Sequence, residues 1–151
     1  MAKIKKALDT KALSTLLRDR GMRITGQRIA VHEAMCELVH ASADQVYEYV
    51  IKHSTTPVTL ASVYNTLSQM ARMGVYRLRL SQDNKLYFDV DMSSNVHLYD
   101  THNHEFRDIN DEHLREDIAA FLRNKRFRGY KIDDVDVQIL CHPTRKKKQL
   151  N

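Results

Sequence analysis

Residues 59–90 read TLASVYNTLSQMARMGVYRLRLSQDNKLYFDV, and this stretch decides the fold because its hydrophobic period changes once within it. In its first half the apolar residues recur at helical spacing, with Leu60, Val63 and Leu67 on one face. That spacing predicts an amphipathic helix. In its second half apolar and polar residues alternate on either side of a turn-forming run, which predicts a hairpin over 75–90. The stretch therefore predicts a helix followed directly by a two-stranded wing.

Three further helices are predicted upstream of this stretch. Residues 8–20 carry three leucines on one face, Thr25 can cap a second helix, and Ser42 with Gln45 has the spacing of a capping box for a third. Helices followed by a wing make a winged helix-turn-helix unit. We assign this unit to residues 1–90.

The rest of the chain predicts a smaller unit of strands and a helix. Residues 91–96 are expected to form a hinge, and strands, a helix over 112–124 and a last strand over 131–140 follow it. A unit as small as 97–151 buries little apolar surface alone, so we expect it to form a homodimer. The predicted fold class is α+β, with an N-terminal winged helix-turn-helix followed by a small α/β dimerisation domain that ends in a basic tail.

Composition and charge narrow the class of protein. The chain has 151 residues, a net charge of +5 and only two cysteines, Cys36 and Cys141, so we expect neither a disulfide framework nor a structural four-cysteine zinc. Residues 1–28 hold eight Lys or Arg against two Asp, which favours a polyanion partner for this half. There is no apolar run long enough to span a bilayer and no signal peptide, so we expect a cytoplasmic protein without a membrane partner.

The helix before the wing is the expected DNA-reading element, because in this fold it enters the major groove. With its apolar stripe turned inward, the side chains expected to face outward or to lie on the flank are polar and uncharged: Ser62, Tyr64, Asn65 and Thr66. Asn pairs with adenine, and the Tyr ring or Thr methyl can contact the methyl group of thymine. The predicted partner is double-stranded DNA with an A·T-rich operator, palindromic because the protein is expected to be a dimer.

Several stretches resemble the ferric uptake regulator superfamily, over about residues 12–141 of the chain. They are GMRITGQR at 21–28, HASAD at 40–44, LASVYNTL at 60–67 and KLYFD at 85–89. Within this superfamily the chain looks most like the iron response regulator branch. The features that carry this likeness are the KLYFD stretch, Asn65 and the missing Cys-x-x-Cys pairs. The resemblance implies a transcriptional regulator of iron-related genes. It also implies that Tyr64 contacts bases, that Arg23 reaches toward the minor groove and that Arg28 holds a phosphate.

The resemblance further implies a regulatory metal site between the DNA-binding and dimerisation domains. The residues that match the family's ligand pattern are His40, Asp89, His97 and Asp108. Asn95 stands where another histidine is expected, so either the site is weakened or His102 or His104 substitutes. Imidazoles with carboxylates suit Fe²⁺ or Mn²⁺, and Zn²⁺ in vitro. The iron response regulator branch is also associated with haem, for which His102 and His104 are the candidate ligands.

Two other classes of function compete with this hypothesis. A metal-dependent enzyme could use the histidine-rich cluster at 102–105, but no His-Glu-x-x-His motif, glycine-rich phosphate loop or nucleophile elbow supports it, so we expect no enzyme. An architectural DNA-binding protein would bind without sequence preference or effector. The sequence leaves open the target genes, repression against activation, and the identity of the effector.

Overall fold

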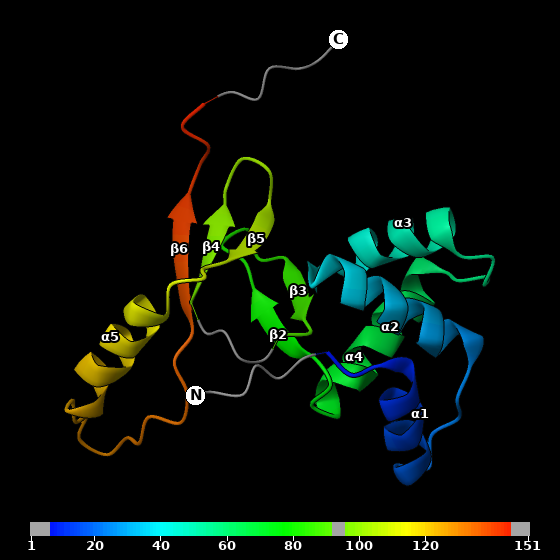
Figure 1. Ribbon diagram of the computed structural model, residues 1–151, viewed down its shortest axis with the longest axis horizontal. Coiled ribbons are helices and arrows are strands. Elements are labelled where there is room, and N and C mark those ends of the chain that lie inside the picture. The colour runs from blue at the N-terminus through cyan, green and yellow to red at the C-terminus, as the bar shows by residue number, and fades with distance from the viewer. Residues whose placement is uncertain (1–6, 92–95, 146–151) are drawn as a thin grey trace. The chain divides into compact units, whose positions relative to one another are not determined.

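The structure is a computed structural model that describes residues 7–91 and 96–145. The chain divides into two compact units, Met1–Ser93 and Ser94–Asn151 (Figure 1). Four residues of the predicted hinge, 92–95, lie outside the described residues. Over the described ranges, none of the helices combines the length and the apolar character that crossing a membrane requires.

Helices and a small sheet build the first unit. Its described elements are α1 (Thr10–Asp19), α2 (Gly26–Leu38), β1 (His40–Ala41), α3 (Ala43–His53), α4 (Leu60–Arg72), β2 (Arg77–Leu80) and β3 (Leu86–Asp89). The caps predicted at Thr25 and Ser42 are confirmed, and Thr59 caps α4 in the same way: each of the three side chains accepts the backbone N–H three residues further on. These caps satisfy amide groups that would otherwise lack a partner at the start of each helix.

The core of this unit lies where the helices meet. The residues that α4 contributes to it differ from those that the sequence predicted. Leu60, expected to face inward, is 43% exposed, whereas Thr66, expected to face the DNA, is only 7% exposed. The buried residues of α4 are Val63, Thr66, Leu67 and Met70, spaced i, i+3, i+4 and i+7. Thr66 completes this stripe, while Leu60 is the first residue of the helix and lies at the end of it. The prediction that Thr66 faces outward was therefore wrong.

The sheet of the first unit has the order β1-β3-β2, with antiparallel pairs. The wing is confirmed as a hairpin: the Ser81 N–H donates to the Lys85 carbonyl over 2.9 Å, and Asn84 takes a positive φ of 59° in the turn. Asn tolerates this left-handed conformation better than most residues. The two-residue strand β1, which sequence patterning did not predict, places β3 in the middle of the sheet.

Val39 connects α2 to β1 in a strained conformation. Its φ and ψ are 63° and −55°, a region that a β-branched residue rarely occupies. The Val39 N–H donates to the Met35 carbonyl over 2.8 Å, and its carbonyl accepts the N–H of Val90 over 3.1 Å. Both backbone groups of Val39 are thus used to end the helix and to hold the strand beside it.

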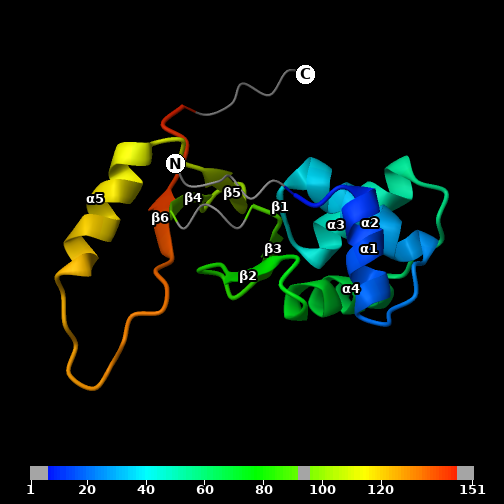
Figure 2. The same ribbon diagram turned by 60° about the horizontal axis from the view of Figure 1, so that its bottom comes forward.

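The second unit contains a three-stranded sheet and one helix within its described part. These are β4 (Val96–Asp100), β5 (Glu105–Asp108), α5 (Glu112–Arg123) and β6 (Val137–Cys141), with the sheet order β5-β4-β6. Strand β4 pairs antiparallel with β5 and parallel with β6. In both views α5 lies on the β6 side of the sheet (Figures 1 and 2).

The last strand is shorter than the sequence predicted. It begins at Val137, not near residue 131. The residues before it include Asp133, Asp134 and Asp136, and aspartate is disfavoured in strands. The predicted start of this strand, at residue 131, was therefore wrong, because it lay within an acidic loop.

The strain at Val39 yields a stability prediction. Val39→Gly should relieve about 1–3 kcal/mol of backbone strain while losing about 1–2 kcal/mol of side-chain burial. We expect the free energy of unfolding to stay within about 1 kcal/mol of wild type. The matched control is Val31→Gly, because Val31 is fully buried within α2 and should cost about 3 kcal/mol or more. Urea unfolding followed by circular dichroism makes the comparison. Equal losses for the two variants would mean that Val39 is not strained.

Candidate functional site

In the first unit, Asp89 is the meeting point of two other side chains. It ends the central strand β3, and His40 lies opposite it on β1. The distance from His40 Nδ1 to Asp89 Oδ2 is 3.1 Å, and Arg79 Nη2 lies 3.4 Å from the same oxygen. The other carboxylate oxygen accepts the N–H of Asp91 over 2.8 Å. One buried carboxylate is therefore shared between an imidazole, a guanidinium and the backbone.

Arg79 is the member of this cluster that the sequence analysis missed. The hairpin register pairs Arg77 with Asp89 and Arg79 with Tyr87. Because side chains alternate along a strand, Arg79 and Asp89 share a face and lie diagonal to each other. The signal was available, since the turn fixes the register of the hairpin. Arg79 also bears on metal binding, because its positive charge opposes that of a cation at the same oxygen.

In the second unit, His97 and Asp108 form a similar pair. They are register partners on β4 and β5, and His97 Nε2 lies 3.2 Å from Asp108 Oδ1. The His97 side chain is fully buried, whereas that of Asp108 is 31% exposed. The ring of Phe106 meets the His97 ring edge-on with 6.3 Å between centroids. Packing thus fixes the imidazole, and the carboxylate stays open to solvent.

The distances within both pairs fit a metal ion. Ligand atoms about 2.1 Å from one ion and about 90–110° apart are separated by about 3.0–3.4 Å. The two imidazole–carboxylate separations, 3.1 and 3.2 Å, lie in that range. Nitrogen and oxygen donors of this kind suit Fe²⁺, Mn²⁺ or Zn²⁺. Each unit by itself therefore presents two donors at chelating distance, and Asn95 lies outside the described residues.

Of the α4 residues expected to read DNA, fewer have available side chains than the sequence predicted. Tyr64 is 44% exposed and Asn65 is exposed. Ser62 serves the helix cap instead: its hydroxyl accepts the N–H of Thr59 over 2.9 Å and donates to the carbonyl of the same residue over 2.8 Å. With Thr66 buried, Tyr64 and Asn65 are the two predicted residues of α4 whose side chains remain available.

The two predicted arginines differ in their surroundings. Arg28 Nη2 donates to Gln69 Oε1 over 3.1 Å, and Arg28 Nη1 donates to the carbonyl of Arg23. Arg28 therefore links α2 to α4, and this brace fixes the helix that carries Tyr64. Arg23 itself is exposed in the segment before α2.

The predicted haem ligands His102 and His104 point to different partners. The ring of His102 stacks on that of His142 with 5.4 Å between centroids, whereas His104 Nδ1 lies 3.4 Å from the Tyr99 hydroxyl. Both residues are exposed. Asp100 closes the turn that carries them, and its hydrogen bond from the Asn103 side chain lowers the pKa of its carboxyl.

Comparisons with known proteins agree with this architecture. Residues 19–140 match the family model described as the ferric uptake regulator family. The ferric uptake regulation protein of Synechococcus elongatus is 36% identical over 80 residues. That match covers 50% of this chain and spans only about half, 54%, of the relative's own length.

Solved structures confirm the predicted fold. The ferric uptake regulator of Vibrio cholerae is 19% identical, with a TM-score of 0.72 over 87% of this chain and 99% of its own. That of Pseudomonas aeruginosa with manganese is 21% identical, with a TM-score of 0.66 over 87% and 98%. At these identities the likeness shows the fold alone, a winged helix followed by a small α/β unit. Proteins of the matching family regulate transcription and are not enzymes, so the enzyme hypothesis is set aside. By the match over residues 19–140, this chain belongs to the ferric uptake regulator family.

Proposed function

We propose that this chain is a sequence-specific DNA-binding regulator of iron-related genes, controlled by a divalent metal ion that His40, Asp89, His97 and Asp108 bind together. The observation that carries the proposal is the pair of imidazole–carboxylate contacts, one within each unit, both at chelating distance. Each contact is observed within one unit. We propose that the two pairs bind the same ion. The missing structural cysteines favour the iron response regulator branch of the family.

The proposed site would act as a restraint between the units. His40 and Asp89 belong to the DNA-binding unit, which we place at 1–90, and His97 and Asp108 to the dimerisation unit at 97–151. If all four bind one ion, they restrict how the DNA-binding unit moves. The metal-bound and metal-free chains would then be two states that differ in their contacts with the ion, and a switch requires such a difference. A bound ion supplies the positive charge that holds two carboxylates and two imidazoles together.

The identity of the ion follows from the donors and is supported by relatives. Similar structures include the ferric uptake regulator of Pseudomonas aeruginosa with manganese, that of Francisella tularensis with iron and a zinc-bound manganese uptake regulator. For this chain we propose Fe²⁺ or Mn²⁺, with Zn²⁺ binding in vitro. Haem is the second candidate effector, and the separate partners of His102 and His104 rank it below the metal.

On the DNA side, Tyr64 and Asn65 are the proposed base-contacting residues, and Arg23 the proposed minor-groove contact. Their polar, uncharged chemistry suits an A·T-rich site. Arg28 is proposed to position α4 through Gln69, in addition to any phosphate contact. A regulator of transcription acts where the genome lies, so we propose that the protein works in the cytoplasm.

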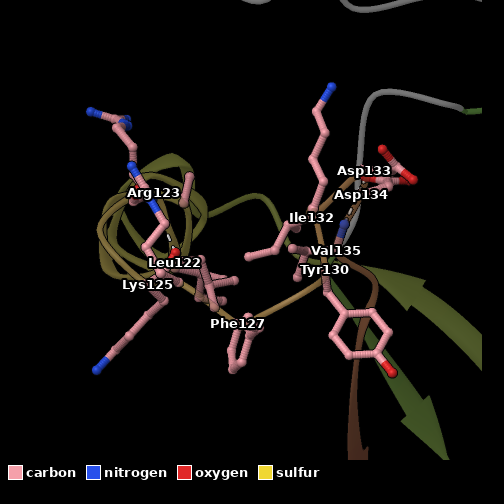
Figure 3. A pocket seen from close by; sticks show the side chains of 13 residues that line it. Leu122, Arg123, Lys125, Phe127, Tyr130, Ile132, Asp133, Asp134 and Val135 are labelled. Atoms are coloured by element: carbon pink, nitrogen blue, oxygen red, sulfur yellow. Dashed lines mark hydrogen bonds between the residues drawn. The ribbon is translucent and has the colours of Figure 1, made fainter.

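The second unit is the proposed dimerisation surface. Large apolar side chains are exposed on it, namely Phe121, Phe127, Tyr130, Ile132, Ile139 and Leu140. Figure 3 shows Phe127 and Ile132 around a cavity of about 520 Å³ that α5 and the loop after it enclose. Apolar surface of this extent needs a partner, and a second copy of the chain would give the operator its palindromic form.

The metal site is tested by metal titration followed by operator binding. His97→Ala should weaken divalent-ion binding by more than about tenfold and abolish the metal dependence of DNA binding. Asn95→His should strengthen metal binding by adding an imidazole. The control is His113→Ala, because the His113 side chain is 94% exposed. If His97→Ala matches wild type in metal and operator binding, the metal site is vestigial. Haem at His102 or His104 then becomes the leading effector.

The reading helix is tested by footprinting on the best operator and on substituted operators. Tyr64→Ala and Asn65→Ala should each reduce discrimination among sites by about 1–3 kcal/mol. Arg23→Ala should weaken binding to all sequences and flatten the salt dependence. Glu48→Ala, an exposed change on α3, is the control. An unchanged footprint for Tyr64→Ala would reject the assignment of α4.

The dimer is tested by sedimentation after exhaustive chelation. Neither Cys36 nor Cys141 has a cysteine partner at zinc-ligand spacing, so the dimer should persist without metal. Phe127→Glu should weaken it, because it places a charge among exposed apolar side chains. A monomer that zinc restores to a dimer would contradict the prediction.

A further inference from the structure

A cysteine and a histidine lie side by side on α2, and neither is one of the proposed regulatory residues. Cys36 follows His32 by four residues, so both occupy the same face of the helix. The distance from Cys36 Sγ to His32 Nε2 is 3.6 Å. His32 is 2% exposed and Cys36 is half-buried. They line a cavity of about 470 Å³ within the first unit.

The hydrogen bonds around His32 fix the position of its proton. The Leu8 carbonyl lies 2.5 Å from His32 Nε2, and since a carbonyl only accepts, Nε2 carries the hydrogen. His32 Nδ1 must then accept the O–H of Tyr76, 2.7 Å away. Burial raises the pKa of the Tyr76 hydroxyl, so it remains a protonated donor. The Cys36 thiol is within reach of the same Leu8 carbonyl, at 3.9 Å.

The separation of the two ligand atoms fits a tetrahedral zinc ion. With Zn–S of about 2.3 Å and Zn–N of about 2.0–2.1 Å, tetrahedral ligands are about 3.5–3.6 Å apart. The observed separation is 3.6 Å. No rotation of α2 is needed to reach this distance, because the i, i+4 spacing of the helix provides it. Glu33, Glu37 and His53 line the same cavity.

The electrostatic surroundings of the pair favour a cation. Burial first, and then the charges of Glu37 and Glu33, raise the pKa of the Cys36 thiol. Carboxylates that oppose the negative charge of a thiolate attract a positive ion to the same place. The thiol is accordingly a poor nucleophile without a metal, which argues against a role in oxidation sensing.

We propose that His32 and Cys36 bind a thiophilic divalent cation of the zinc class, at a second metal site that belongs to the DNA-binding unit alone. On binding, Cys36 releases its thiol proton to solvent. The His32 proton moves from Nε2 to Nδ1 and is donated to the Tyr76 hydroxyl oxygen, the usual arrangement of a metal-bound histidine. The Leu8 carbonyl loses both donors. The site therefore couples metal binding to the attachment of the segment that joins basic residues 1–6 to α1.

The test uses the full chain, with its thiols reduced, titrated with Co²⁺ alone. Cobalt bound by a thiolate gives a charge-transfer absorption band in the near ultraviolet, and the proposed regulatory residues contain no sulfur. We expect the band in wild type and its loss in Cys36→Ser. Cys141→Ser is the matched control, since Cys141 is the other cysteine of the chain, and it should keep the band. Zn²⁺ should abolish the band by displacement.

A second variant tests whether the two glutamates contribute to cobalt binding, and it leaves the buried His32 unchanged. Glu33→Gln combined with Glu37→Gln changes two exposed side chains and should weaken cobalt binding by at least about threefold. Absence of the band in wild type, its survival in Cys36→Ser, or its loss in Cys141→Ser would each overturn the site. His97→Ala should leave the band unchanged, so failure of the regulatory site and failure of this one are separately visible.

Discussion

The central position of β3 in the first sheet is the constraint on which the candidate site depends. A middle strand has a neighbour on each side, so its last residue, Asp89, meets His40 from β1 and Arg79 from β2. Strand β1 is two residues long and exists because Val39 turns the chain out of α2 and accepts the N–H of Val90. A single strained residue thus determines whether an imidazole stands beside the carboxylate.

The second unit reaches a similar arrangement by a different route. There the imidazole and the carboxylate are register partners in one antiparallel pair, His97 on β4 and Asp108 on β5. In both units the donors are placed by hydrogen-bonded strands and not by loops, and donors on rigid elements are held more precisely. The second pair is asymmetric, since the His97 side chain is buried and that of Asp108 is 31% exposed, whereas in the first pair both side chains are buried.

Local signals account for the part of the fold that the sequence predicted. The caps at Thr25, Ser42 and Thr59 depend on residues three positions away, and the hairpin turn depends on five consecutive residues. Each can therefore be predicted from the local sequence without tertiary information. Strand β1 has no such signal, because two residues carry no periodicity. The prediction that Thr66 faces outward failed because the buried stripe of α4 was assumed to include Leu60. Leu60 is the first residue of the helix, where an apolar side chain need not be packed. Of the candidate site, the identities of the paired residues were predicted through resemblance, whereas Arg79 and the pair on α2 appeared only with the distances.

The lack of any fully buried residue in α5 has a consequence for how the protein folds. A 12-residue helix is marginal in water without tertiary packing. The first unit has a continuous core of its own, whereas α5 would gain stability from the second copy of the chain proposed above. In the proposed dimer, folding of the second unit would be a bimolecular equilibrium whose midpoint rises with protein concentration. The abundance of the chain would then set the fraction of molecules whose second unit is folded.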